Sequence, residues 1–598
     1  MSKTFPRMAW MIVVAALCVS LAIFPACGGG GGGGGTPIPL KNPGDFIEQT
    51  IGDLDTLDPS WHYDTASAEQ IYYMYDTLVF YDGTSTDTFV PGLATSWSFA
   101  PNGTQFRATI RSGVKFWNNE TLTPEDVEYT FERAMIQDRA GGPTWMFNGP
   151  IAGVARSRSA GVPRPWWCEY VQNAIYVEGG DVVIDFNSSY PSIPWLQIIG
   201  NTFGAVINMD WCVAKGDWSP NYTANWTAYN NPASKSNTVL FDEAMGTGPW
   251  MLDVWNPGVQ IKLVKNADYW QGTPPFNNVI TQVVDEWTSR KLALLAGDAD
   301  LVYVPKPYIN EVINVTDLLK ISGLPELTVD AFFMNMDIGV NSTYIGSKAL
   351  DGNGIPSNFF TDRDVRLGFV YSFDYDTYMT DVMMSEGTMM ASPIIQGLFG
   401  YDAGEPRYAL CLTKATQHFQ AAWGGALWTN GFKMTLCYNT GNVPRKTACE
   451  MLAETLGDIN PLFQVSILPI AWDTYLDLLF TPSGITDLPM FQIGWQCDYP
   501  DPDNFVDPFM GTVGAFSDYQ GYGNTTIDDL IVAGRYMNNN ATRQAIYDQL
   551  EDIYVYDVPG IMLAQPEGRR WFTKYIHGFY FNPTIPGLPG PLFDMTKS

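Results

Sequence analysis

The sequence has almost no histidine and lacks the common catalytic motifs. Only His62, His418 and His577 occur in 598 residues, and none has the H-E-x-x-H spacing of a zinc site. A G-x-S-x-G elbow, a G-x-G-x-x-G turn after a strand and a Walker A loop are also missing, since "GNVPRKT" at 441–447 lacks the second glycine of a phosphate loop. Paired carboxylates, as in glycosidases, stay open, but nothing singles out a catalytic pair. We therefore expect neither an enzyme nor a metal or cofactor site.

Basic residues are also scarce. Lys and Arg total 33 against 63 Asp and Glu, which gives a net charge of −30. Such a chain is repelled by nucleic acid and by anionic lipid, so neither is an expected partner. The length of 598 residues exceeds what one compact core usually organises, and it predicts two or more lobes.

The N-terminus has the pattern of an export signal. Lys3 and Arg7 precede an apolar run that ends at Cys27, and a glycine run follows. The pattern resembles a lipoprotein signal, in which Cys27 is lipidated and the Gly/Pro-rich segment 28–45 is a tether. The alternative is that 1–27 stays uncleaved as a membrane anchor, because about 20 apolar residues can span a bilayer. Both predict a domain on the extracellular face of the cytoplasmic membrane, in a periplasm or an archaeal pseudoperiplasm.

Cysteine and asparagine usage agrees with export. Six cysteines follow the signal and no C-x-x-C pair occurs, so disulfides are expected. On lobe membership alone, we expect Cys168–Cys212 and Cys411–Cys449. Glycosylation sequons of the form N-x-S/T, which predict a glycoprotein, begin at Asn102, Asn119, Asn187, Asn221, Asn225, Asn314, Asn341, Asn524 and Asn540.

Helical and strand patterns alternate along the chain. Residues 123–136 predict a helix, because Thr123 can cap it, Pro124 suits its first position and an apolar face repeats behind them. Residues 364–373 and 541–559 also have helical periodicity, whereas 181–186 and 259–265 alternate as strands do. Mixed elements over this length predict an α/β protein.

Six sequence blocks occur in the order of a known family. They are "TLDPSW" (56–61), the strand hairpin and helix of 91–134, "GTGPWMLDVW…NADYW" (246–270) continuing to 280, "LLAGDADLV" (294–302), "FTDRDVRLGFVYSFDYD" (360–376) and "GWQCDYPDPDNF" (494–505). Together they resemble the extracytoplasmic solute-binding proteins of peptide and nickel ABC importers, from about residue 46 to the C-terminus. Tyr375, where the family often has arginine, and the insertion-like segment 138–172 depart from the pattern.

The resemblance implies an α/β clam-shell of two lobes joined by hinge strands, like a type II periplasmic binding protein with an extra subdomain. It assigns 46–81, 191–305 and 566–598 to lobe 1, 82–190 to the extra subdomain and 306–565 to lobe 2. Closure on a ligand would be a hinge motion.

The resemblance also nominates site residues. In peptide-binding members, the aspartate at the position of Asp498 pairs with the ammonium group of the ligand. Backbone at Gly494 would pair with an extended peptide, and Trp495 would form a wall of the pocket. The alternative is that Asp498 caps its own turn and Trp495 belongs to the core.

On the facing lobe, the resemblance nominates Trp61, Thr65 and Ser67, although their place near a turn favours a surface loop for each of them. Asn335 is expected to be either a ligand contact near the hinge or a cross-strand hydrogen-bonding group.

The predicted function is capture of peptides for an ABC importer, by a monomer that meets the permease subunits. Oligosaccharide is the alternative ligand, because 20 tryptophans offer faces that stack on sugars. Nickel is disfavoured by the scarcity of histidine. A receptor or adhesin without a transporter is the remaining alternative.

Overall fold

A computed structural model describes residues 37–598 except 222, 482, 536, 538–539 and 588–589. The chain divides into two units, Met1–Pro37 and Ile38–Ser598. The predicted signal or anchor, the lipidation site Cys27 and half of the expected tether therefore lie outside the described residues. Within the described part, no helix is both long enough and apolar enough to cross a membrane.

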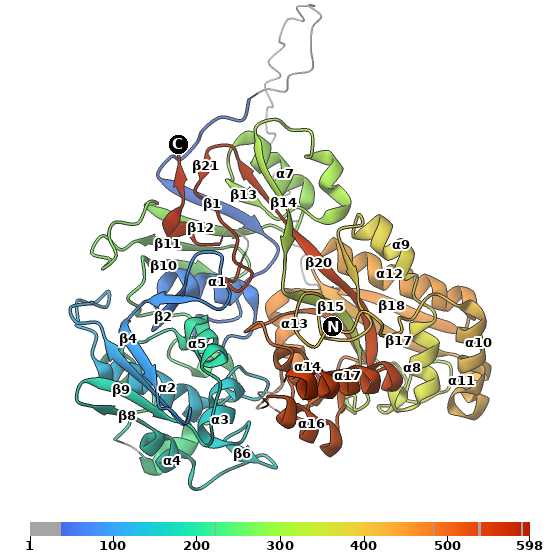
Figure 1. Ribbon diagram of the computed structural model, residues 1–598. Coiled ribbons are helices and arrows are strands. Elements are labelled where there is room, and N and C mark those ends of the chain that lie inside the picture. Colours follow the sequence, from blue (N-terminus) through green and yellow to red (C-terminus); the bar gives the residue numbers. More distant parts are fainter. Residues whose placement is uncertain (1–36, 222, 482, 536, 538–539, 588–589) are drawn as a thin grey trace, which may run out of the picture. The chain divides into compact units, whose positions relative to one another are not determined.

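A mixed sheet of 12 strands runs through the unit Ile38–Ser598 (Figure 1). Its central path is β10 (Trp250–Asn256), β11 (Gln260–Lys265), β12 (Asn278–Val283), β1 (Asp45–Thr50), β13 (Leu301–Val302), β20 (Gly560–Thr573), β15 (Thr328–Met334), β19 (Met490–Gln496), β17 (Phe432–Asn439) and β18 (Phe463–Ile470). Strands β14 (Leu318–Pro325) and β16 (Gly387–Met389) pair with β20.

Strand β20 lies in the middle of this sheet and links its two halves. Its first residues pair with β15, and its last residues pair with β13 and β14. A 14-residue strand can do this because it is long enough to give its two halves to different partners.

A separate antiparallel sheet has the order β4 (Ala94–Phe99), β5 (Gln105–Ile110), β9 (Asp181–Asp185) and β8 (Ile175–Glu178). Helix α2 (Pro124–Gln137) packs on β8 and β9. The carboxylate of Asp126 accepts hydrogen bonds from the backbone N–H and the hydroxyl of Thr123, both at 2.9 Å. The predicted helix and its capping contact are thus confirmed, as is the strand predicted at 181–186.

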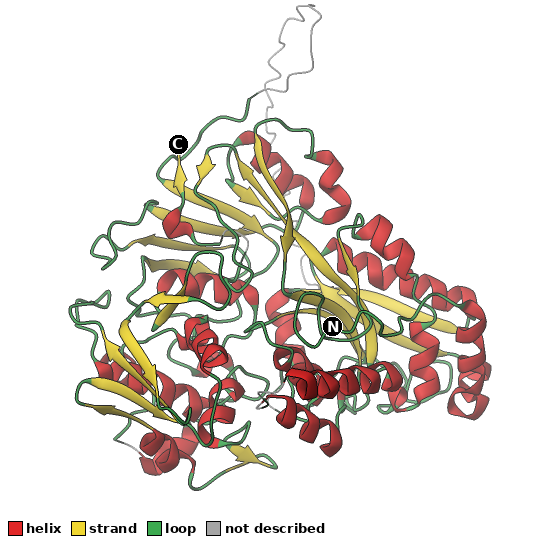
Figure 2. Ribbon diagram, viewed as in Figure 1, coloured by secondary structure: helices red, strands yellow, loops and turns green. Residues whose placement is uncertain are grey.

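The remaining predicted elements are also present. The strand at 259–265 is β11, the helix at 364–373 is α8 (Arg363–Val370), and the helix at 541–559 is α17 (Asn540–Asp557). Other helices that matter for the site are α1 (Thr65–Met74), α12 (Val443–Ile459), α13 (Trp472–Leu479) and α14 (Asp503–Met510). Helices lie against the faces of the sheets (Figure 2).

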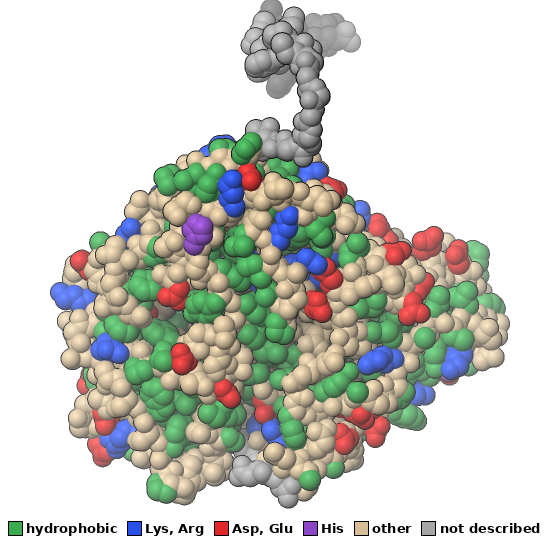
Figure 3. Space-filling model, turned by 45° about the horizontal axis from the view of Figure 1, so that its top comes forward, with side chains coloured by type: hydrophobic (Ala, Val, Ile, Leu, Met, Phe, Trp, Pro, Cys, Tyr) green, Lys and Arg blue, Asp and Glu red, His purple; other side chains and the backbone are tan. Residues whose placement is uncertain are grey.

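Buried side chains form one large cluster, the first core, from residues 46–301 and the C-terminal segment, with Tyr499 added. Two further clusters, the second core, come from residues 329–564 and lie on opposite faces of β15. Phe332 and Met334 enter one of them, while Val329, Ala331 and Phe333 enter the other, as the twofold alternation of a strand dictates. Acidic and basic side chains are scattered over the surface seen in Figure 3.

The expected disulfides are wrong. The six cysteines of the described chain are free thiols, so neither Cys168–Cys212 nor Cys411–Cys449 is formed. Cys168 Sγ lies 3.9 Å from Gln172 Oε1, and Cys449 Sγ donates to Gln492 Oε1 at 3.6 Å. Membership of one lobe does not bring two Cβ atoms to the roughly 4 Å that a disulfide needs. Most of these thiols are buried as small apolar groups.

Candidate functional site

A cavity of about 370 Å³ is lined by residues from distant parts of the chain. The segment 50–70 contributes one wall, and residues 493–498 after and within β19 contribute another. Loop 581–587 and helix α12 complete it. The volume lies within the range of small-molecule sites, which typically measure about 300–1,000 Å³.

Asp498 lies in this cavity immediately after β19 and is 6% exposed. Its Oδ2 accepts hydrogen bonds from the Tyr63 hydroxyl at 3.0 Å and from Asn504 Nδ2 at 2.9 Å. Its backbone is held as well, because its N–H donates to Asn504 Oδ1 at 2.7 Å and its carbonyl accepts from Asn201 Nδ2 at 2.9 Å. The side chain therefore has one fixed position.

Burial raises the pKa of Asp498 to about 7, and the hydrogen bonds from Asn504 and Tyr63 offset only part of that rise. Both donors are neutral, so they leave the charge of the carboxylate uncompensated. A cation entering the cavity would favour the ionised form and lower this pKa.

Aromatic rings hold Tyr63, the hydrogen-bond donor to Asp498, in place. Trp145 Nε1 donates to the Tyr63 hydroxyl at 2.9 Å, and the Tyr63 ring meets the Trp495 ring edge-on at 5.4 Å. Trp145 comes from the insertion-like segment 138–172, so that segment reaches the site. Trp495 Nε1 donates to the carbonyl of Asn504 at 2.8 Å, and its ring both lines the cavity and joins the second core. The two alternatives for Trp495 are thus both fulfilled.

Gly494 lines the cavity within β19, paired with Asp330 of β15. A Cβ atom there would lie 2.9 Å from Asp330 Oδ1 and 3.1 Å from Arg445 Nη2. Glycine is therefore required by the close approach of these two side chains, which a larger residue would displace.

Of the residues nominated on the facing lobe, only some line the cavity. Thr65 opens α1, is exposed and lines the cavity. Ser67 does not line it: its hydroxyl is buried and accepts hydrogen bonds from the backbone N–H groups of Asp55 and Thr56. Trp61 is also outside the lining, because its ring packs under the Arg139 guanidinium at 5.2 Å.

Asn335 follows β15 and does not line the cavity either. Its amide donates to the carbonyls of Thr486 and Leu488 at 3.3 and 3.1 Å, and its side-chain oxygen accepts from the Asp337 N–H at 2.8 Å. Its side chain therefore makes the hydrogen bonds of the second alternative, and it lies outside the cavity lining.

Two arginines in the lining had not been nominated. Arg445 lies in the first turn of α12, where it donates to Asn439 Oδ1 at 2.9 Å and to Asp330 Oδ1 at 3.1 Å. Its Nε is buried without an acceptor. Arg570 of β20 donates to Glu326 Oε1 at 3.0 Å. Arg445 lies in the segment "GNVPRKT", which the sequence analysis considered only as an incomplete phosphate loop. No sequence motif pointed to Arg570.

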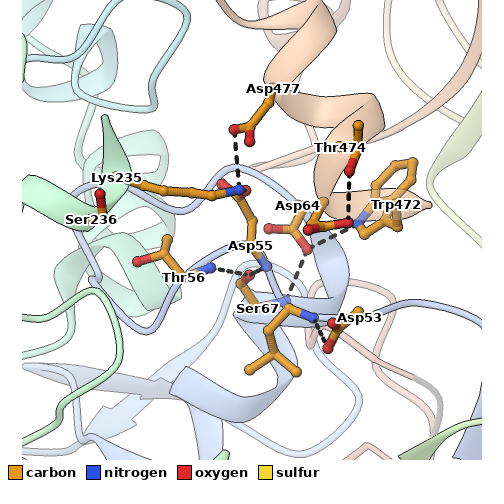
Figure 4. Close-up of polar contacts among 12 residues, drawn as sticks. Asp53, Asp55, Thr56, Asp64, Ser67, Lys235, Ser236, Trp472, Thr474 and Asp477 are labelled. Carbon is orange, nitrogen blue, oxygen red and sulfur yellow. Dashed lines mark hydrogen bonds and ion pairs between the residues drawn. The ribbon is translucent and has the colours of Figure 1, made fainter. Parts of the chain in front are cut away.

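Figure 4 shows a cluster of polar contacts that includes Asp53, Asp55, Asp64 and Asp477, of which Asp64 lines the cavity. Lys235 Nζ lies 2.6 Å from Asp55 Oδ1 and 3.1 Å from Asp477 Oδ1, so it bridges the segment after β1 to helix α13. Asp64 lines the cavity and accepts from Trp472 Nε1 at 3.4 Å. Burial, and then the nearby charge of Asp55, raise the pKa of Asp64 to about 6.

The residues that the structure describes contain no group of three His, Cys, Asp or Glu side chains arranged to hold a metal ion. None of the three histidines lines the cavity. The site consists of buried carboxylates, two arginines, aromatic rings and backbone groups, which can bind a ligand by charge and hydrogen bonding.

Comparisons with known proteins agree with this architecture. Residues 88–517 match the model of the bacterial extracellular solute-binding proteins, family 5. The chain is 25% identical to the "Probable D,D-dipeptide-binding periplasmic protein DdpA" of Escherichia coli, over 89% of this chain and 90% of that one. It is 24% identical to "Heme-binding protein A" of Haemophilus influenzae, over 87% and 86%.

A solved structure has the same fold. It is the oligopeptide-binding protein AppA of Bacillus subtilis in complex with a nonapeptide, with a TM-score of 0.73 and 18% identity, covering 94% of this chain and 100% of that one. This confirms the predicted α/β fold of periplasmic binding proteins.

The matched segment exceeds half of the chain, and its family is one of solute-binding proteins rather than enzymes. The chain therefore belongs to family 5 of the extracellular solute-binding proteins, the substrate-binding components of peptide and nickel ABC importers.

Proposed function

We propose that this protein captures peptides outside the cytoplasmic membrane and delivers them to an ABC importer, with the peptide ammonium group held by Asp498. The observation that carries the proposal is the burial of this carboxylate in the cavity wall between neutral donors. A buried carboxylate is costly until a cation pairs with it, and a peptide ammonium supplies that cation.

The rest of the cavity suits a peptide. Gly494 brings the β19 backbone to the wall, where an extended ligand can pair with it as an added strand. Arg445 has a buried Nε without an acceptor, and a carboxylate of the ligand would supply one. Trp495 and Phe516 give the cavity apolar surface for side chains.

Native mass spectrometry tests the proposal. The protein from Thr36 onward is purified without refolding, and whatever it carries is identified after denaturation. Peptides are expected from the wild type and should be lost on Asp498→Asn. The matched control is Asp501→Asn in the same sequence block, because Asp501 pairs with Arg543 and does not line the cavity. Released oligosaccharide or haem would overturn the peptide ligand and leave the fold intact.

The proposal includes tethering and glycosylation. We infer that Cys27 carries a lipid and that the tether spaces the binding domain from the membrane as far as residue 37, because the folded unit begins at Ile38. Glycosylation is supported by exposure, because the asparagine of each of the sequons named above is exposed. The intact mass of protein from its native membrane should exceed that of the chain from Cys27 onward by lipid and glycan masses. A mass equal to the bare chain would contradict both modifications.

A further inference from the structure

One wall of the cavity presents hydrogen-bond acceptors without matching donors. Glu48 of β1 is 1% exposed, and within the described chain both of its carboxylate oxygens lack a hydrogen-bond donor. Gln70 Oε1, on α1, is buried and likewise without a donor there. Buried acceptors of this kind are costly unless a ligand, a proton or a cation satisfies them.

These acceptors belong to one continuous group. Glu48 stands opposite Thr281 in the parallel pairing of β1 with β12, and Thr281 lines the cavity. Gln70 Nε2 donates to Thr281 Oγ1 at 3.1 Å and to Glu69 Oε1 at 3.0 Å. Glu69 and Gln70 line the cavity, whereas Glu48 is buried and is not part of the lining. Because both hydrogens of the Gln70 amide are engaged, only its oxygen is left to face a ligand.

Charged neighbours also act on Glu48. Burial, and then the Glu69 carboxylate, hold the pKa of Glu48 well above its usual range. Arg570 lowers it, but this guanidinium forms an ion pair with Glu326 at 3.0 Å. Two carboxyl groups that face one another must hold a proton or a cation between them.

We propose that Glu48, Glu69 and Gln70 form a second cation subsite, which takes the ammonium or guanidinium group of a lysine or arginine side chain. The protein then selects basic peptides, with one cation on Asp498 and another on this wall. An ammonium group fits because it has three donors and no acceptor. This inference rests on the proposed peptide ligand.

Isothermal titration calorimetry tests the subsite with matched tripeptides. Ala-Ala-Ala is the scaffold, and lysine or norleucine is placed at each of its three positions in turn. Norleucine keeps the four-carbon stem and lacks the charge. In the wild type, at least one lysine peptide should bind about tenfold or more tightly than its norleucine partner, as close buried charge pairs do.

Variants then test whether the preference for lysine peptides comes from Glu48 and Glu69. Glu48→Gln should bring the lysine-to-norleucine ratio close to one and leave the affinity for the norleucine peptides unchanged. Glu69→Gln is the second variant, in case Glu48→Gln does not fold. The matched control is Glu450→Gln, because Glu450 lies exposed on α12 and pairs only with Lys446. It should keep the wild-type ratio.

Proton release distinguishes the subsite from a structural role. The groups that face Glu48 are Glu69 and Tyr73 from α1 and Arg570 from β20. A lysine ammonium displaces the proton of the carboxyl pair, so heats in buffers of different ionisation enthalpy should report more protons released by lysine than by norleucine peptides.

The outcomes separate the two proposals. Equal binding of all tripeptides overturns the cation subsite and leaves the peptide function standing, with a shared proton on the carboxyl pair as the explanation. Absence of binding by any tripeptide overturns both. A lysine preference that survives in both Glu48→Gln and Glu69→Gln contradicts this location.

Discussion

The hydroxyl of Tyr63 donates a hydrogen bond to Asp498 Oδ2 at 3.0 Å, although 435 residues separate them in the chain. The backbone carbonyl of the same aspartate accepts a hydrogen bond from Asn201 Nδ2, which lies 297 residues away. Asp498 is thus both a candidate ligand group and a point where distant segments meet. Binding of a cation there would act on the packing of both cores.

Peptide binding should tighten as pH rises towards 7. Because the pKa of Asp498 is raised to about 7, the carboxyl is mostly protonated at pH 5 and must release its proton to an ammonium ligand. Between pH 5 and 6.5 the affinity should increase by up to about tenfold per pH unit. Calorimetry across this range measures it. Asp498→Asn should bind weakly and with a much flatter pH dependence.

Without ligand, the free energy of unfolding should decrease as pH rises from 5 to 7.5. The folded-state pKa of Asp498 is raised above its unfolded value, so the protonated carboxyl stabilises the folded state. This contribution to the free energy of unfolding is fully present below about pH 4 and is lost as pH rises to about 7. Urea unfolding at pH 5 and pH 7.5 should give the larger free energy of unfolding at pH 5. Asp498→Asn should reduce this difference, and an unchanged difference would contradict the assignment.

The ion pair of Lys235 with Asp55 should stabilise the folded protein more than its ion pair with Asp477. The side chain of Asp55 is 5% exposed, whereas that of Asp477 is 62% exposed. Lys235→Met leaves the buried Asp55 without its cation and should cost about 2–4 kcal/mol. Asp477→Asn, the matched control, should cost about 1 kcal/mol or less. Equal losses in thermal or urea unfolding would show that burial does not decide the effect.

The aspartate of the "LDP" block has a structural role. Asp58 accepts two hydrogen bonds from Arg133, at 2.9 and 2.7 Å, and Arg133 also pairs with Asp217 at 2.6 Å. Arg133→Met leaves two buried carboxylates and should cost about 3–5 kcal/mol. Arg107→Met removes a side chain that is 30% exposed and pairs at the surface, so it should lower the free energy of unfolding much less than Arg133→Met does. Urea unfolding of both variants makes the comparison.

All six cysteines after the signal should react as free thiols once the chain is unfolded. Iodoacetamide added to the unfolded, unreduced chain from Thr36 onward should modify the six cysteines, and a reductant should leave the melting temperature unchanged. Modification of only four, with two more after reduction, would restore a disulfide. The buried thiols should react slowly in the folded protein, since burial raises the pKa of Cys437 to about 12.

The sequence predicted the elements whose signals are local. Helix α2 was predicted from Thr123 and Pro124, which act within its first turn, and from its apolar face. Helix α17 was predicted from its periodicity. Ser67 was less predictable, because its hydroxyl turns to the backbone of Asp55 and Thr56, and so away from the cavity. Helix phase and turn geometry decide such directions, and neither is explicit in a motif.

By itself the sequence determined the family, the α/β class and the position of Asp498, because ordered blocks and short-range patterns carry that information. Tertiary structure alone decided that Arg445 and Arg570 join the cavity, that Trp61 and Asn335 do not, and that the thiols stay apart. The physical reason is that these outcomes depend on side-chain directions in segments up to several hundred residues apart. Long-range pairing of strands and buried polar groups fixes those directions only when the whole unit folds.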